Sequence, residues 1–184
     1  MRLHWLPNAI SIMRIVLVPP ILWLLHGGRY AEAVVLFVIA GFSDGIDGWL
    51  AKRYNWHSRL GALLDPIADK LLIAGVFFLL VTAELIPLWL GIIVILRDVV
   101  IVGGATAYNF LVRPVQGEPT RISKLNTALE LLLVVFVLCR AAFDWPPPIS
   151  VTVLGAAVLV TVVVSGIDYV MAWSRRARHS LQQG

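Results

Sequence analysis

The feature that most constrains the fold of this chain is a series of six long apolar runs. They follow one another with only short polar segments between, at about residues 9–26, 31–51, 62–83, 86–111, 124–143 and 148–173. A helix needs roughly 20 apolar residues to cross the hydrocarbon core of a bilayer, and each run is near that length or longer. The runs are continuous rather than alternating, which argues against the strands of a membrane β-barrel. We therefore predict an all-α integral membrane bundle of six transmembrane helices.

The composition agrees with a membrane protein and leaves no segment for a soluble domain. Hydrophobic residues make up 59% of the chain and charged residues only 14%, whereas soluble domains contain about 25% charged residues. The longest non-apolar segment, 113–124, holds two prolines and a glycine and is typical of a loop. We predict one membrane domain over residues 1–184, with a short interfacial segment at the N-terminus that carries Trp5. The basic tail from residue 175 is expected to be a frayed, solvated end.

Basic residues gather in alternate connections between the runs and in the tail. The opposite connections hold few of them. By the positive-inside rule, both termini and the basic connections face the cytoplasm. Topology and attraction to anionic lipid head groups explain these residues, so no nucleic-acid partner is expected. No transit peptide is apparent, which favours a bacterial inner membrane. The basic residues concerned are Lys52, Arg53, Arg59, Arg113, Arg121, Lys124, Arg175, Arg176 and Arg178.

Four aspartates stand at the cytoplasmic ends of the second and third runs. Asp44 and Asp47 are three residues apart, and Asp65 and Asp69 are four apart, so each pair occupies one helix face. The short segment between the runs lets the two helices lie antiparallel, which brings both pairs to one interface. Crowded carboxylates raise each other's pKa, and hard cations such as Mg²⁺, Mn²⁺ or Ca²⁺ compensate them with oxygen coordination. The spacing therefore predicts a cation site.

Small residues continue the helix faces that carry the aspartates. Gly48 and Ala51 each follow an aspartate of the first pair by four residues, and Gly61 precedes the second pair by one turn. They leave a slot beside the carboxylates in which a flat or bulky ligand could lie. The alternative is that the aspartates only cap helices or form ion pairs with neighbouring cations, which explains one or two of the four more readily than all. Those neighbours are Lys52, Arg53 and Lys70.

The same stretch resembles the signature of the CDP-alcohol phosphotransferases, D-x2-D-G-x2-A-R-x8-G-x3-D-x3-D. Every spacing of the signature fits residues 44–69, and the six predicted spans agree with the family along the whole chain. The one departure is Lys52, where the family usually has arginine. A lysine keeps the positive charge but loses the planar fork that binds phosphate in a bidentate manner. The resemblance identifies the stretch as a candidate active site.

The resemblance implies a reaction and a role for each residue of the stretch. Such enzymes move a phosphatidyl or phosphoalcohol group from a CDP-linked donor to a hydroxyl and release CMP. Two divalent cations would be bound by Asp44, Asp47, Asp65 and Asp69, with Mg²⁺ expected first and Mn²⁺ as the alternative. Asp69 would also be the general base that deprotonates the acceptor. The family further implies a homodimer. The residues expected to bind the CDP donor are Asp44, Gly48, Ala51, Lys52 and Gly61.

The acceptor is indicated by stretches outside the signature. Residues 6–20 and 64–72 resemble the branch that contains CMP-forming cardiolipin synthases and phosphatidylglycerophosphate synthases. The Arg-Asp pair at 97–98 and the Ile-Ser-Lys-x-Asn-Thr run at 122–127 are similar to the cardiolipin synthases, whereas the other group more often has Arg-Glu and Gly-Lys-x-Lys-Thr. The resemblance favours transfer from CDP-diacylglycerol to phosphatidylglycerol, giving cardiolipin. The alternative acceptor is glycerol 3-phosphate.

Five residues are candidates for binding the acceptor, and each has a structural alternative. Arg97 either holds an acceptor phosphate or forms an ion pair, with Asp98 or between helices, since an ionisable residue inside an apolar run is a functional candidate. The residues near 124–127 either line the acceptor pocket or only cap the fifth helix and face lipid heads. Arg59 either reaches a phosphate or is an ordinary basic loop residue. Glu130 and Asp168 are expected to pair with polar groups inside the bundle. The acceptor candidates are Arg59, Arg97, Lys124, Asn126 and Thr127.

Two other functions fit a membrane protein with buried acids. Membrane prenyltransferases also bind Mg²⁺-diphosphate with aspartates, but their motifs lie in distant repeats, whereas here Asp47 and Asp65 are 18 residues apart. Cation-coupled transporters usually show inverted repeats and broken helices near the midplane. Neither pattern is visible in this chain, so both functions are disfavoured.

Overall fold

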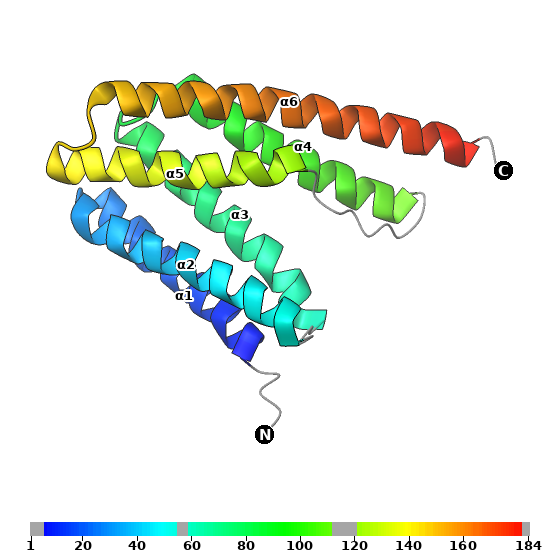
Figure 1. Ribbon diagram of the computed structural model, residues 1–184, viewed down its shortest axis with the longest axis horizontal. Helices are drawn as coiled ribbons and strands as arrows, with labels where there is room; N and C mark the ends of the chain where they lie inside the picture. Colours follow the sequence, from blue (N-terminus) through cyan, green and yellow to red (C-terminus); the bar gives the residue numbers. More distant parts are fainter. Residues whose placement is uncertain (1–5, 55–58, 112–120, 182–184) are drawn as a thin grey trace. The chain divides into compact units, whose positions relative to one another are not determined.

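The computed structural model describes residues 6–54, 59–111 and 121–181, with side chains placed over 12–43, 70–104, 122–169 and at 171. Across these ranges the chain forms six helices and no strand, which confirms the predicted all-α class (Figure 1). Each helix corresponds to one apolar run of the sequence. The helices are α1 (Leu6–His26), α2 (Tyr30–Tyr54), α3 (Arg59–Thr82), α4 (Leu88–Leu111), α5 (Arg121–Phe143) and α6 (Pro148–Leu181).

The last two helices contain segments that are long and apolar enough to cross a membrane. These segments are Ile122–Phe143 of α5 and Pro148–Tyr169 of α6. Large apolar side chains on α4 and α6, such as Leu96 and Val153, are exposed, as expected where lipid rather than water surrounds a helix. The fold is that of a membrane-associated helical protein. A crossing by all six helices, with both termini in the cytoplasm, stays a prediction.

The helix ends differ from the apolar runs at both termini of the chain. α1 is continuous from Leu6 onward. The part of the predicted interfacial segment that begins at this residue therefore belongs to the first helix. At the other end, the expectation of a frayed tail from residue 175 is wrong as far as Leu181, because α6 continues to that residue. Arginine, alanine and leucine are good helix formers, and basic residues near a helix C-terminus interact favourably with its dipole.

The contacts of the chain divide it into two compact units. Unit 1 comprises Met1–Ile86 and Val134–Pro148, and unit 2 comprises Pro87–Leu133 and Ile149–Gly184. Unit 1 thus holds α1, α2, α3 and the second half of α5, while unit 2 holds α4, the first half of α5 and α6. One domain over residues 1–184 stays a prediction.

In unit 1, α1 packs against both α2 and α3. The two helices approach closely at a glycine: a Cβ atom at Gly75 would lie 3.0 Å from the Leu22 Cδ1 atom, so the Leu22 side chain would have to shift by a few tenths of an ångström. Phe37 on α2 and Phe77 on α3 are buried in the core of the unit. α2 and α3, which carry the signature, are therefore both held by α1.

The ends of α1 and α3 are closed by the same backbone arrangement. After α1, Arg29 N donates to Leu24 O at 2.9 Å, and Gly28 has a positive φ of 70°. After α3, Leu85 N donates to Leu80 O at 2.9 Å, and Glu84 has a positive φ of 58°. Both are Schellman motifs, in which a left-handed residue satisfies the last carbonyls of a helix. Glycine adopts this conformation freely, whereas a glutamate is strained in it.

We expect Glu84→Gly to raise the free energy of unfolding by about 0.5–1 kcal/mol. The left-handed conformation costs a residue with a side chain about 1–2 kcal/mol, of which roughly half is returned by the greater unfolded-state entropy of glycine. Unfolding in mixed detergent micelles, followed by circular dichroism, measures the change. Gly28→Glu is the matched reverse substitution and should destabilise by a similar amount. Equal unfolding midpoints for Glu84→Gly and the parent chain would contradict the expected strain.

Candidate functional site

The signature residues lie on two helices of unit 1 that follow each other in the chain. The first aspartate pair lies in the second half of α2, and the second pair lies in the first half of α3. Only residues 55–58 separate the two helices, so their ends are no more than about 18 Å apart even if this connection is fully extended. Figure 1 shows the end of α2 and the beginning of α3 at the same end of unit 1. The predicted helix–connection–helix arrangement of the signature is confirmed.

The side chains of residues 44–69 lie outside the described part of the structure. Their backbone is helical, which sets the helix face that each residue occupies. Residues 44, 47, 48 and 51 share one face of α2, and residues 61, 65 and 69 share one face of α3. The donor set on these two faces consists of carboxylate oxygens alone, which suits Mg²⁺ or Mn²⁺ rather than a softer metal. The residues present therefore fit the divalent cations that the signature implies, and the cation site stays a prediction.

In unit 2, Arg97 on α4 is the centre of a buried polar cluster. Its Nη1 atom donates to Asp98 Oδ1 at 2.8 Å, and the two residues form an ion pair. Its Nη2 atom donates to Ser123 Oγ on α5 and to Ser165 Oγ on α6, each at 2.7 Å. The arginine is only 6% exposed. One guanidinium thus joins all three helices of unit 2, and the ion pair with Asp98 that the sequence left as an alternative is present.

Ser165 was not singled out from the sequence, and Ser123 entered only as part of the Ile-Ser-Lys-x-Asn-Thr run at 122–127. Both are buried, and both are small hydroxyl residues inside or at the end of an apolar segment. The signal that could have found them is the general tendency of helix contacts in membranes to use small and hydroxyl residues, which bond across helices. That tendency does not say which serine of several faces a given arginine.

A second polar contact between α5 and α6 involves Asn126. Its Nδ2 atom donates to Glu130 Oε1 at 2.6 Å, one turn further along α5, and its Oδ1 atom accepts from Thr161 Oγ1 at 2.8 Å. Asn126 and Glu130 are both fully buried. The expected pairing of Glu130 with a polar group inside the bundle is confirmed. Because both ends of the Asn126 amide are engaged, this residue holds α5 against α6.

The other acceptor candidates differ in how far their side chains are buried. Lys124 is exposed, whereas its neighbours Ser123 and Asn126 are buried. The first turns of α5 therefore present a lysine on the exposed side and polar side chains on the buried side. Thr127 is half-buried, and its Oγ1 atom donates to Ser123 O at 3.2 Å. The side chain of Arg59, at the start of α3, lies outside the described residues. Of the acceptor candidates, Arg97 and Asn126 therefore lie in the buried polar contacts of unit 2.

Known proteins resemble the chain over most of its length. It is 32% identical over 180 residues to a human protein named cardiolipin synthase (CMP-forming), a match that covers 89% of this chain and 60% of that protein. It is 30% identical over 184 residues to a Bacillus subtilis protein named CDP-diacylglycerol–glycerol-3-phosphate 3-phosphatidyltransferase, covering 89% of this chain and 92% of that protein. A Streptomyces coelicolor cardiolipin synthase (CMP-forming) is 41% identical over 103 residues, covering 53% and 48% of the two chains.

This chain spans about 60% of the length of the human relative. A sequence profile for CDP-alcohol phosphatidyltransferases matches residues 4–164. The match includes the whole signature stretch on α2 and α3 together with Arg97, Asp98 and Ser123 of the polar cluster. The chain therefore belongs to the CDP-alcohol phosphatidyltransferase family.

Proposed function

We propose that this protein transfers the phosphatidyl group of CDP-diacylglycerol to a glycerol-type hydroxyl and releases CMP. The observation that carries the proposal is the signature, complete except for Lys52, with its four aspartates and three small residues on two consecutive helices of one unit. We place the reaction at the cytoplasmic face of a bacterial inner membrane, because the basic connections flank these helices. At such an interface a lipid donor enters from the bilayer while its nucleotide reaches water.

In this proposal the residues of the chain position the donor and accept a proton. Gly48, Ala51 and Gly61 leave room for the cytidine nucleotide, and Lys52 holds a phosphate by its point charge. The four aspartates would hold two divalent cations, which when bound supply positive charge to the diphosphate and the departing CMP. An Asp69 carboxylate oxygen takes the proton of the acceptor hydroxyl. The acceptor oxygen then bonds to the phosphatidyl phosphorus as the bond from phosphorus to the CMP oxygen breaks.

We propose phosphatidylglycerol as the acceptor, with cardiolipin as the product. The sequence patterns of the cardiolipin synthases and of the phosphatidylglycerophosphate synthases differ at positions 98, 123 and 126. All three residues take part in the buried polar contacts of unit 2. A lysine at position 126 would bring a further cation, whereas Asn126 is neutral and its amide is engaged with Glu130 and Thr161. A less cationic site suits a phosphodiester with one negative charge better than a phosphate monoester with two. The human and Streptomyces relatives named cardiolipin synthase also support this acceptor.

Glycerol 3-phosphate is the second candidate acceptor. It is favoured by the Bacillus subtilis relative, whose name specifies that acceptor and which this chain covers over 92% of its length. Exposed Lys124, on the first turn of α5, is a cation that a soluble phosphate could reach.

An acceptor assay with purified protein tests both the reaction and its substrate. The protein is incubated in detergent micelles with labelled CDP-diacylglycerol, Mg²⁺ and one acceptor at a time, and CMP and lipid products are separated. We expect CMP and cardiolipin with phosphatidylglycerol, loss of both with excess chelator, and recovery when Mg²⁺ is restored. Product formed only with glycerol 3-phosphate would replace the proposed acceptor. Absence of CMP with every glycerol-based acceptor would reject the reaction itself.

A further inference from the structure

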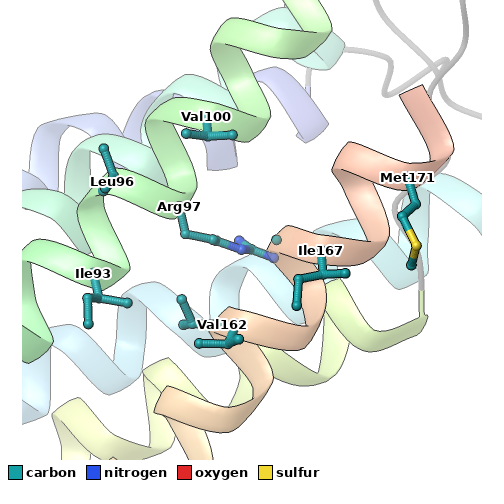
Figure 2. A pocket seen from close by; sticks show the side chains of 9 residues that line it. Ile93, Leu96, Arg97, Val100, Val162, Ile167 and Met171 are labelled. Carbon is teal, nitrogen blue, oxygen red and sulfur yellow. The ribbon is translucent and has the colours of Figure 1, made fainter. Parts of the chain in front are cut away.

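Two arginines are buried among the residues whose side chains the structure describes, and one of them has no role in the proposed reaction so far. Arg97 of unit 2 extends from α4 toward α6 beside an apolar groove (Figure 2), and its ion pair with Asp98 compensates its charge. Arg14 lies on α1 in unit 1 and is only 1% exposed. A guanidinium stays charged in proteins, and a charge taken out of water is costly unless it is compensated. Anionic groups are therefore expected near Arg14 as well.

The register between α1 and α3 places Arg14 at the level of the second aspartate pair. Both helices run in the same direction (Figure 1), and Gly75 on α3 lies against Leu22 on α1. Arg14 is eight residues before Leu22, and the midpoint between Asp65 and Asp69 is eight residues before Gly75. At 1.5 Å per residue, each of these two aspartates lies within about 3 Å of the level of Arg14 along the helices.

The turn between α1 and α2 places the first aspartate pair near the same level. The two helices pack against each other and are joined by a tight turn centred on Gly28, so they run in opposite directions. Arg14 lies 14 residues before this glycine, and Asp44 and Asp47 lie 16 and 19 residues after it. The two aspartates are therefore about 3 Å and 8 Å from the level of Arg14. Since the axes of packed helices are about 8–10 Å apart, one buried cation lies near both pairs.

The other acidic residues of unit 1 are not at this level. Glu32, Glu84 and Asp144 are exposed, and they lie in the connections that follow α1, α3 and α5 or within one turn of them. Glu32 also forms an ion pair with Arg29. The remaining acids of unit 1 are the four aspartates of the signature. Within this unit, the signature is therefore the group of carboxylates that stands at the level of Arg14.

We propose that Arg14 is a positioning residue of the cation site, whose charge compensates the signature carboxylates when no divalent cation is bound. The inference rests on the proposed cation site. Four carboxylates near one another repel each other, and a guanidinium at their level reduces this repulsion. The same positive charge repels a divalent cation that enters. Arg14 therefore stabilises the cation-free form of the site and weakens cation binding.

Titration with Mn²⁺ alone tests this role without any measurement of turnover. Protein in an uncharged detergent is titrated at fixed pH, and the free ion is measured by its electron paramagnetic resonance signal. We expect Arg14→Met to bind Mn²⁺ about tenfold more tightly than the parent chain. At about 10 Å and an effective dielectric constant of about 20, the repulsion between a guanidinium and a divalent cation exceeds a tenfold effect on affinity before screening by salt. A substitution that only disturbed packing would weaken binding instead.

Unfolding in the same detergent gives a second readout, which must agree with the first. A cation that binds only the folded chain stabilises it according to its affinity. Arg14→Met should therefore lower the free energy of unfolding more in excess chelator than in saturating Mn²⁺. The two losses should differ by about 1.4 kcal/mol, the equivalent of a tenfold change in affinity. Equal losses with and without Mn²⁺ would overturn the proposal.

Three further variants make the test specific. Arg14→Lys keeps the positive charge and should leave the Mn²⁺ affinity within twofold of that of the parent chain. Arg29→Met changes the net charge by the same amount as Arg14→Met, but at an exposed residue after α1, and should also stay within twofold. Arg14→Gln keeps polar donors without the charge. It should reproduce the tighter binding, including the case in which Arg14→Met does not fold.

The outcomes separate this inference from the cation site on which it rests. If the parent chain binds no Mn²⁺, or if Asp44→Asn binds it as tightly as the parent, the cation site is rejected and the role of Arg14 with it. Parent-like affinity in the neutral variants of Arg14 would reject the role of Arg14 alone. Weaker binding in those variants would show that Arg14 only supports the packing of the helices, and would overturn the proposal as well.

Discussion

Asp69→Asn is expected to lower CMP release by about 10²–10⁴-fold, the usual contribution of a general base. Asparagine has nearly the same size as aspartate but cannot take the proton of the acceptor hydroxyl. The three other aspartates of the signature remain, so binding of CDP-diacylglycerol should be largely retained. CMP release is measured under saturating donor and Mg²⁺, and donor binding is measured separately with a labelled nucleotide lipid.

The control for this substitution is Asp144→Asn, the same chemical change at an exposed residue of the turn after α5. Asp144 has a positive φ of 56°, and asparagine tolerates this conformation well. We expect this variant to keep the parent rate. Near-normal turnover of Asp69→Asn would show that another group is the base. A loss of donor binding equal to the loss of rate would place Asp69 chiefly among the cation ligands.

Arg97→Met is expected to lower the free energy of unfolding by about 3–5 kcal/mol, because it breaks a buried ion pair by removing the guanidinium that pairs with the Asp98 carboxylate. The substituted side chain fills similar space, so the loss comes from electrostatics rather than from a cavity. The hydrogen bonds to Ser123 and Ser165 are lost as well. The Ser165 hydroxyl can turn to a carbonyl of its own helix, which limits that part of the cost. Unfolding in mixed detergent micelles measures the change.

The double variant Arg97→Met with Asp98→Asn separates charge from packing. It removes both charges, and replacing both members of a buried pair is often nearly neutral. We expect it to recover more than half of the stability that Arg97→Met loses. If the double variant is as unstable as the single one, the contacts of Arg97 with α5 and α6, rather than its ion pair, stabilise unit 2.

The helices and the signature could be predicted from the sequence because they depend on local order along the chain. A run of about 20 apolar residues forms a helix wherever it lies, since a bilayer leaves no other partner for its backbone groups. The spacing of Asp44 and Asp47, or of Asp65 and Asp69, sets their common helix face without reference to any other helix. The residues expected to bind the CDP donor therefore lie in one continuous stretch, 44–69, and the family match includes this stretch.

Only the tertiary structure decided which face of each helix turns inward. A helix that is apolar all round gives no periodic signal of its orientation: Val94 is buried and Leu96 is exposed, although both are aliphatic. The partners of Arg97 come from 26 and 68 residues away, at Ser123 and Ser165, and nothing local distinguishes these serines from others. The packing of α4, α5 and α6 therefore selects the polar contacts and leaves the groove beside them.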